Sequence, residues 1–355
     1  MAGYLATGSF RNLCRLARCV NVAERVSCNN PNSLVQQMRH MSSYTHLIKQ
    51  TGGYLGTGST PQEVHGKKGP KRFLVTGATG QIGMELVPYL RDRFGVEQVI
   101  ASDIRTSKTQ LGSGPFVYCD VQDYDNLARV ILESGVDYIV HLASLLSAIG
   151  ERNPQLALKV NTVGTQNVLE LARQHELQVF SPSTIAVYGE SAPKFNSPDS
   201  TVKEPSTMYG ITKVHLELLG EYYRSKYGVD FRSLRYPGVI SSNTMPGGGT
   251  TDYAVEIYHE AIKHGKYECF LEEDMFLPMI YMPDCLKATV DLMLAPRENL
   301  TQACYNVTAM SFSPKDLSAS IVKHVPEFEV KYNPDFRQVC PQHCNVLQWF
   351  PTPSA

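Results

Sequence analysis

The chain has 355 residues, of which 43% are hydrophobic and 19% are charged, and its formal net charge is −1. This composition predicts an ordinary globular protein with one large domain or two modest ones. The nearly neutral balance gives no electrostatic reason to expect nucleic acid as a partner, and no apolar run approaches the roughly 20 residues of a membrane-spanning helix. The nine cysteines form no dense framework, which favours a reducing compartment.

The first fifty residues have the composition of a mitochondrial transit peptide. Their only acid is Glu24, and apolar residues between positions 9 and 26 alternate with arginines at helical spacing. The basic residues are Arg11, Arg15, Arg18, Arg25, Arg39 and Lys49. The alternative is a tail without a signal. Residues 51–70 are rich in glycine and lack a periodic pattern, so they predict a flexible linker, with folded structure from about Lys71.

Folded structure is predicted to open with a strand, a glycine turn and a helix. The apolar run 73–76 is followed by Gly-Ala-Thr-Gly-Gln-Ile-Gly at 77–83 and then by a helical pattern. Gly77 allows a sharp turn, Gly80 lets the backbone approach a pyrophosphate, and Gly83 lets helix and strand pack closely. Because the helix start also presents free amides to phosphate, the arrangement predicts a dinucleotide site.

Two acids follow the next predicted strands. Asp103 ends the strand that begins at residue 98, and it lies twenty residues after Gly83. A carboxylate there accepts the ribose hydroxyls of adenosine and repels a 2′-phosphate, which favours NAD over NADP, although Arg105 is a counter-signal. Asp120 ends the apolar run 116–121, where it either borders the adenine pocket or caps the helix that follows.

Strands and helices continue to alternate through about residue 240. The strand 138–142 leads into the segment 143–147, where the strand order of such a sheet reverses and a ligand crevice opens. The predicted fold class is therefore α/β, with a Rossmann-type doubly wound parallel sheet over residues 71–240. Residues 241–338 are predicted to form a smaller C-terminal substrate lobe, and the Pro-rich residues 339–355 a divergent tail.

A tyrosine and a lysine four residues apart carry the predicted chemistry. Tyr209 and Lys213 share one face of a predicted helix, and Ser183 and Thr184 end the preceding strand. A hydroxyl loses its proton as hydride leaves the carbon, yet a phenol with a pKa of about 10 is a poor acceptor near neutral pH. The Lys213 ammonium, helped by the positive nicotinamide ring, is expected to lower the pKa of Tyr209, while Thr184 orients the substrate oxygen.

In their order and separation, the glycine turn, Asp103, Thr184, Tyr209 and Lys213 resemble the short-chain dehydrogenase/reductase family. The glycine spacing resembles its extended branch, which includes nucleotide-sugar epimerases. Within that branch, four runs are similar to the enzymes that oxidise L-threonine. These runs are residues 141–151, 182–185, 234–240 and 246–254, and the resemblance covers residues 71–338.

The resemblance implies oxidation of L-threonine to L-2-amino-3-ketobutyrate with release of NADH, ahead of cleavage by a 2-amino-3-ketobutyrate CoA ligase as functional partner. It also implies a homodimer that pairs through helices near 155–174 and 209–227. For NAD it implies contacts from Gly77, Ala78, Thr79, Gly80, Gln81, Ile82, Gly83, Asp103, Ile104, Arg105, Asp120, Val121, Leu142, Ala143, Tyr209, Lys213 and Val239. For the substrate it implies Ser147, Ser183, Thr184, Tyr209 and Thr250.

The glycine run 247–249 is expected to bring backbone amides close to a carboxylate and to give a lid its hinges. His141, inside an apolar strand, is interpreted as a satisfied core residue, and Asp284 as a helix cap or a residue of the domain interface. No metal is expected, because the sequence lacks clustered Cys, His and Glu ligands. Two alternatives stay open: a nucleotide-sugar epimerase or dehydratase, and a non-catalytic NAD-binding protein, which the divergent tail favours.

Overall fold

The computed structural model describes residues 70–106, 111–193, 195–245, 247–307, 309–339 and 345–346. The predicted transit peptide, residues 1–50, and residues 51–69 of the predicted linker lie outside the described residues. Of the predicted tail, only residues 339 and 345–346 are described. All described residues belong to one compact unit, Gly66–Ala355.

The centre of this unit is a parallel sheet in the order β12-β8-β5-β4-β1-β2-β3, with β6 paired to β8. Each of these pairings is parallel. The strands are β1 (Phe73–Thr76), β2 (Val99–Asp103), β3 (Phe116–Tyr118), β4 (Tyr138–His141), β5 (Gln178–Phe180), β6 (Ser183–Thr184), β8 (Asp230–Tyr236) and β12 (Cys304–Asn306). The strand order reverses between β1 and β4, which is where doubly wound sheets open a ligand crevice. The predicted fold class is confirmed.

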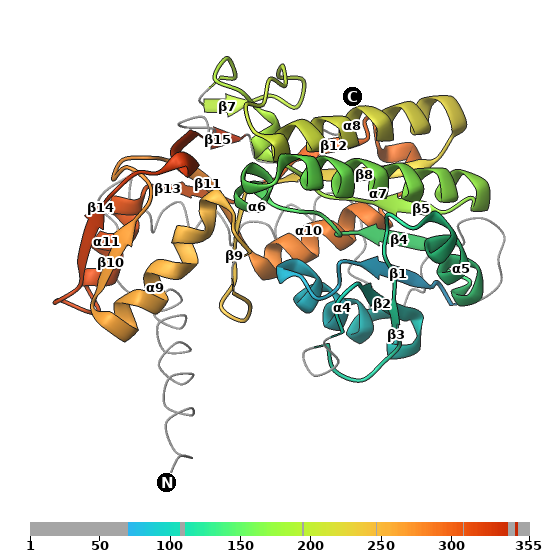
Figure 1. Cartoon of the computed structure of the whole chain (residues 1–355), viewed down its shortest axis with the longest axis horizontal. Coiled ribbons are helices and arrows are strands. Elements are labelled where there is room, and N and C mark those ends of the chain that lie inside the picture. The colour runs from blue at the N-terminus through green and yellow to red at the C-terminus, as the bar shows by residue number, and fades with distance from the viewer. Residues whose placement is uncertain are drawn as a thin grey trace, which may run out of the picture. The chain divides into compact units, whose positions relative to one another are not determined.

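Helices cover both faces of the sheet (Figure 1). One face carries α4 (Gln81–Phe94) and α10 (Met282–Leu294), and the other carries α5 (Tyr124–Ser134), α7 (Pro154–His175) and α8 (Met208–Tyr227). Side chains of β1 alternate between the two cores: Phe73 and Val75 pack with α4 and α10, while Leu74 packs with the other three helices. This period of two is the pattern of a strand covered on both faces.

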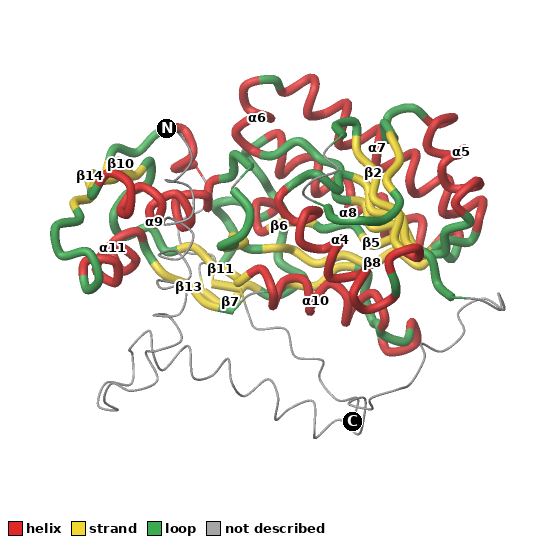
Figure 2. The backbone as a smooth tube through the Cα atoms, turned by 90° about the horizontal axis from the view of Figure 1, so that it is seen from below, coloured by secondary structure: helices red, strands yellow, loops and turns green. Residues whose placement is uncertain are grey.

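Shorter elements gather to one side of the large sheet (Figure 2). They are α9 (Tyr253–His264), α11 (Pro314–Val322), the β13-β11-β9 sheet and the β10-β14 pair. The strands are β9 (Gly238–Ile240), β10 (Lys266–Cys269), β11 (Leu277–Tyr281), β13 (Met310–Phe312) and β14 (Glu329–Tyr332). The remaining elements are α6 (Ser147–Arg152) and the pair of β7 (Phe195–Ser197) with β15 (Asn345–Val346).

The segment 241–338 contributes to both parts of the unit. Its first elements build the shorter sheets, but α10 then packs into the core beneath β1, and β12 becomes the edge strand of the large sheet. The chain afterwards returns to the shorter sheets with β13 and α11. Among the described residues, no helix has the length and apolar character needed to cross a membrane.

Candidate active site

The glycine turn closes tightly against the end of β4. Gly77 has a φ of 69°, and a Cβ atom on it would lie 2.6 Å from the backbone nitrogen of Ala143. A Cβ on Gly83 would lie 2.6 Å from the carbonyl oxygen of Gly77. Both positions therefore require glycine, and the predicted strand, turn and helix are confirmed. At Gly80, α4 begins without a side-chain cap, so its first amides face the crevice without a side-chain acceptor.

Asp103 stands at the end of β2, where it is 7% exposed, and it ties the glycine turn to the sheet. Its Oδ2 accepts bonds from the Thr79 amide at 3.0 Å and the Thr79 hydroxyl at 2.7 Å, while Oδ1 accepts the Arg105 amide at 3.1 Å. Because a carboxylate has about four lone-pair positions, one remains on Oδ1 for a ribose hydroxyl. The two-hydroxyl contact expected from the sequence requires Thr79 to release one bond.

The other predicted adenosine residues line the same edge. Ile104 is 57% exposed, and the Arg105 side chain is exposed beside Asp103. Asp120 Oδ1 accepts the Gln122 amide at 2.9 Å, whereas the cap of α5 is Asp123. The helix-cap interpretation of Asp120 is therefore wrong, because the cap lies three residues later. Val121, buried, follows Asp120, and Asn167 donates to its carbonyl oxygen at 2.9 Å.

The segment after β4 forms the opposite wall of the crevice. The Leu142 amide donates to Thr76, which holds Leu142 and Ala143 against the glycine turn. The Ser144 Oγ atom is buried and has no hydrogen-bond partner among the described residues. Sequence reasoning did not select this hydroxyl, although its place directly after Ala143 was a signal. Ser147 follows as the first residue of α6 and is partly exposed.

Asn161 of α7 fixes this wall to the helix that carries Tyr209. Its Oδ1 accepts the Leu145 amide at 2.8 Å, and its Nδ2 donates to the Leu145 carbonyl and to Thr212 Oγ1. The Thr212 hydroxyl in turn donates to the Tyr209 carbonyl at 2.8 Å. A single buried amide therefore holds the end of the switch-point loop at a fixed distance from Tyr209.

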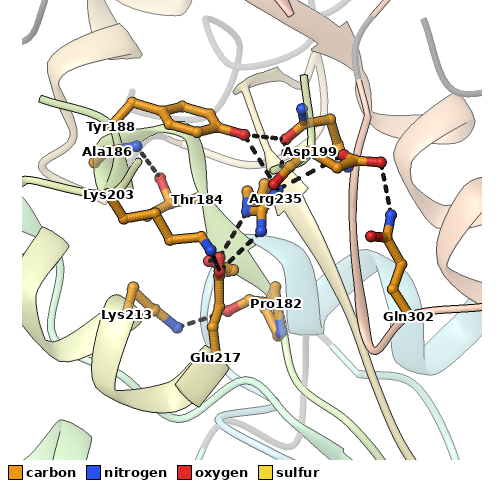
Figure 3. A network of polar contacts seen from close by, with 12 residues as sticks. Pro182, Thr184, Ala186, Tyr188, Asp199, Lys203, Lys213, Glu217, Arg235 and Gln302 are labelled. Atoms are coloured by element: carbon orange, nitrogen blue, oxygen red, sulfur yellow. Dashed lines mark hydrogen bonds and ion pairs between the residues drawn. The ribbon is translucent and has the colours of Figure 1, made fainter. Parts of the chain in front are cut away.

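Tyr209, Lys213 and Thr184 come together as the sequence predicts. Tyr209 lies in the first turn of α8, which Thr207 caps, and its phenol lies close enough to the hydroxyl of Thr184, at the end of β6, for that hydroxyl to lower its pKa. Lys213, one turn later, is 6% exposed, and its Nζ lies 5.6 Å from the centre of the Tyr209 ring. That Nζ donates to the carbonyl oxygen of Pro182 at 2.8 Å (Figure 3).

The pKa values of this pair are shifted by burial. Burial raises the pKa of Tyr209 to about 12, against the lowering effect of the Thr184 hydroxyl bond. Lys213 is not among the causes of this shift, since its ammonium is directed at Pro182. The expected lowering by Lys213 together with the positive nicotinamide ring stays a prediction. Burial lowers the pKa of Lys213 to about 8, and the charge of Glu217 opposes that shift. At neutral pH the pair thus holds a phenol and an ammonium.

Ser183 is expected to contact the substrate, but its side chain is directed at another residue of the chain. It is 2% exposed, and its hydroxyl donates to Glu217 Oε1 at 2.5 Å. Glu217 belongs to α8 and is bonded through both oxygens to Arg235 of β8. Sequence reasoning selected neither member of this buried pair. The available signal was the position of Glu217, four residues after Lys213 and eight after Tyr209.

The glycine run lies against the start of α6. The Ala148 amide donates to the Gly248 carbonyl at 3.1 Å, so the run and Thr250 after it border the wall that carries Ser147. The amides of Gly248 and Gly249 both donate to Asp252 Oδ2 at 2.6 Å. The expectation that these amides are open to a ligand carboxylate is wrong here, because a side chain of the chain itself occupies them.

Three remaining predictions concern single residues. Val239 of β9 is partly exposed, and its carbonyl oxygen lies 3.5 Å from Gln81 Nε2, which joins the smaller sheet to the start of α4. His141 is a core residue, as expected: its Nδ1 bonds with the Thr76 hydroxyl at 2.9 Å, and burial lowers its pKa to about 3. Asp284 lies in the first turn of α10, but Tyr281 occupies the cap position, so the cap interpretation is wrong.

Among the described residues, no cluster of three or more His, Cys, Asp or Glu side chains has the arrangement of a metal site. The four described cysteines, Cys119, Cys269, Cys285 and Cys304, are buried and free. The described groups of the predicted site are thus the glycine turn, the Asp103 carboxylate, the Tyr209 phenol and the Lys213 ammonium. This set suits the binding of a dinucleotide and the transfer of a proton at a hydroxyl.

Comparison with known proteins shows which family the chain resembles. The sequence profile of the NAD dependent epimerase/dehydratase family matches residues 73–308. The chain is 50% identical over 266 residues to a mitochondrial L-threonine 3-dehydrogenase of Bos taurus, covering 75% of this chain and 71% of that protein. A crystal structure of an L-threonine dehydrogenase from Phytophthora infestans is 62% identical, with a TM-score of 0.74 over 77% of this chain and 88% of that one.

An X-ray structure of an L-threonine dehydrogenase from Clostridium difficile is also similar. It is 45% identical, with a TM-score of 0.75 over 78% of this chain and 88% of that chain. The residues that match the family profile, 73–308, include the glycine turn and the helix that carries Tyr209. The chain therefore belongs to the NAD dependent epimerase/dehydratase family.

Proposed function

We propose that this protein is an NAD-dependent dehydrogenase that oxidises L-threonine to L-2-amino-3-ketobutyrate. One observation carries the proposal: the phenol of Tyr209 lies close enough to the Thr184 hydroxyl for that hydroxyl to lower its pKa, and it lies one helical turn from Lys213, whose Nζ is 5.6 Å from the centre of its ring. The similarity to threonine dehydrogenases of 45 to 62% identity supports L-threonine as the substrate.

The residues present fit NAD. The glycines at 77 and 83 leave no space for a side chain, and α4 starts with amides that no side chain caps, which suits a pyrophosphate. Asp103 keeps one lone-pair position for a ribose hydroxyl and carries the charge that repels a 2′-phosphate. Bound NAD supplies the acceptor for the hydride that leaves Cβ of threonine and a positive charge close to the site.

The chain's own residues handle the proton. Tyr209 first gives up its own proton, and as a phenolate it takes the proton of the substrate hydroxyl while hydride leaves Cβ, so that Cβ becomes a carbonyl carbon. The hydroxyl of Thr184, which lies close enough to Tyr209 to lower its pKa, orients the hydroxyl oxygen of the substrate for that transfer. Because burial raises the pKa of Tyr209 to about 12, proton transfer depends on positive charge near the phenol, and Lys213 is the nearest described ammonium.

Three further assignments belong to the same proposal. The basic N-terminal fifty residues and the mitochondrial relatives support import into the mitochondrial matrix. A 2-amino-3-ketobutyrate CoA ligase is the expected functional partner, because the product is the substrate of such an enzyme. A homodimer through α7 and α8 is supported by their outward apolar side chains. These are Leu156, Leu158, Ile211, Leu218, Tyr222 and Tyr227, each at least 36% exposed.

The proposal is tested with the purified full chain, NAD and L-threonine, by following NADH absorbance. We expect NADH with L-threonine and none with UDP-glucose. Tyr209→Phe should keep NAD binding, measured by calorimetry, and lose at least ~100-fold in turnover, the scale of a missing acid–base group. Tyr124→Phe is the matched control and should keep wild-type turnover, because the Tyr124 hydroxyl lies at the start of α5 and donates only to the exposed Gln174. Equal rates in wild type and Tyr209→Phe would remove Tyr209 from the mechanism.

A further inference from the structure

A buried ion pair lies next to Lys213 on the face of α8 that carries Tyr209 and Lys213. Glu217 continues that face, because Tyr209, Lys213 and Glu217 recur at intervals of four residues. Arg235 of β8 donates from Nε to Glu217 Oε1 at 2.8 Å and from Nη2 to Oε2 at 2.9 Å. The two side chains are 3% and 4% exposed, so the bidentate contact is removed from water (Figure 3).

Three successive turns of α8 contact three successive residues of the segment 182–184. Tyr209 lies beside the hydroxyl of Thr184, which lowers the pKa of the phenol. Lys213 donates to the carbonyl oxygen at position 182 at 2.8 Å. Glu217 accepts the hydroxyl of Ser183 at 2.5 Å. The first two contacts involve groups of the proposed chemistry, whereas the third ties the same segment to the buried pair.

The pair is itself fixed to the large sheet. Ser183 and Arg235 are register partners in the β6–β8 pairing, so Glu217 binds two adjacent strands at the same level. The remaining side of the guanidinium is also engaged: Nη1 donates at 3.1 Å to the Tyr188 hydroxyl and to Asn306 Oδ1 of β12. Arg235 therefore cannot shift without breaking contacts in three elements, which makes it a rigid support for the Glu217 carboxylate.

We propose that Glu217 is a positioning residue for the oxidation described under the proposed function. Held by Arg235, its carboxylate holds Ser183 and thereby keeps the neighbouring Thr184 hydroxyl against Tyr209. Ser183 accordingly serves the site through Glu217 and not as a contact of the substrate. The proposal rests on the proposed function for its kinetic consequences, but the position of Thr184 is a property of the chain alone.

The energetics of buried charges support this assignment. Removing two charges from water costs several kcal/mol per ion, and well-packed apolar residues of similar volume often stabilise a fold as well or better. A buried pair is therefore a poor device for stability alone. The Glu217 carboxylate adds a hydrogen-bond acceptor in a fixed position and orientation. The hydroxyl of Ser183, the residue next to Thr184, donates to that acceptor.

The first test is Ser183→Ala, because this variant keeps the ion pair intact and removes only the link to the strand. Glu217→Ala is less suitable, since it leaves Arg235 buried without its partner. We expect kcat of Ser183→Ala to fall by about tenfold, because a small misplacement of the reacting groups is costly, while KM for L-threonine stays within about twofold. A raised KM with unchanged kcat would overturn the proposal and make Ser183 a substrate contact.

A double-mutant cycle separates positioning from a general loss of order. In a Thr184→Ala background the link has nothing left to position, so adding Ser183→Ala should lower kcat by less than about twofold. The same tenfold loss in both backgrounds would contradict the proposal. Lys203→Met is the matched control: Lys203 contacts Glu217 Oε2 at 3.4 Å from a partly exposed place and has no link to Ser183. Its kcat should stay within about twofold of wild type.

A crystal structure of Ser183→Ala gives a readout that does not depend on activity. We expect the Thr184 and Tyr209 oxygens to lie farther apart than in a wild-type crystal structure determined in the same way. An unchanged distance between these two oxygens would overturn the positioning role even if threonine is the substrate. Conversely, a wild-type protein that releases no NADH with L-threonine would refute the proposed function, while this crystal structure would still decide the role of Glu217.

Discussion

Replacing Asp252 by Asn should make the protein more stable at neutral pH, by an amount that grows as the pH rises from about 5 and levels off at about pH 7. The carboxylate of Asp252 accepts the amides of Gly248 and Gly249 through a single oxygen, Oδ2. An asparagine can place its own oxygen there and keep both bonds. The substitution therefore removes the charge while leaving the acceptor, so that it isolates the cost of burying a carboxylate in the glycine run.

The magnitude follows from the pKa. Burial raises the pKa of Asp252 from 3.8 to about 6, against the lowering effect of the two amide bonds. A carboxyl whose pKa is raised on folding contributes stability that is complete below pH 3.8 and is lost as the pH rises through about 6. The difference of 2.2 units, 6 minus 3.8, corresponds to about 3 kcal/mol at pH values well above 6. Between about pH 5 and pH 8 the change is about 1.4 kcal/mol.

The assay is urea unfolding of wild type and Asp252→Asn at a series of pH values between about pH 5 and pH 8. The free energy of unfolding of the variant minus that of wild type should rise by about 1.4 kcal/mol across the series, and all other titrating groups cancel in this difference. Asp252→Ala should show the same slope from a lower starting value, because it also loses the acceptor. A flat or falling difference would refute the assignment of a raised pKa to Asp252.

Three further outcomes are expected. Gly77→Ala should lower the free energy of unfolding by at least about 1–2 kcal/mol and abolish NAD binding by calorimetry, since its backbone is left-handed and its Cβ would press on Ala143. Asp103→Ser should weaken NAD binding by about tenfold and reduce the ratio of the NAD affinity to the NADP affinity. An unchanged ratio of these two affinities would contradict the role of Asp103 in excluding the 2′-phosphate. Lys213 carries its charge below a pKa of about 8 and loses it above that pH, so the kcat of the wild type should fall as the pH rises through about 8. Lys213→Met should be at least ~100-fold slower, and its kcat should show no such fall at alkaline pH.

The parts of the site that the sequence predicts well are those set by local spacing. The strand, turn and helix around Gly77 and Gly83 require glycine for steric reasons that act within a few residues. Tyr209 and Lys213 share a helix face because of the helical period, and that face meets Thr184 because β6 ends at the crevice. Such features follow from neighbouring residues, so they can be recognised without knowledge of the tertiary structure.

Features that depend on distant partners were missed or reversed. The amides at positions 248 and 249 are occupied by Asp252, and nothing in a glycine run shows which acceptor will reach it. The direction of the Tyr209 pKa depends on how deeply the phenol is buried and on the carbonyl that attracts Lys213, both of which are tertiary facts. The same holds for the segment 241–338, whose helix α10 and strand β12 return to the large sheet through packing with β1 and β8.

Glu217 shows how such a feature can be recognised from the sequence. A helix that packs on a sheet normally presents apolar side chains to it, and yet α8 presents Tyr209, Lys213 and Glu217 in succession on its inner face. Local sequence and buried environment disagree at these three positions. Disagreements of this kind concentrate where function demands them, because each buried polar group needs a partner supplied by the rest of the fold. A third ionisable residue at the same interval therefore points to a strand that offers a third partner, and in this protein that partner is Ser183, backed by Arg235.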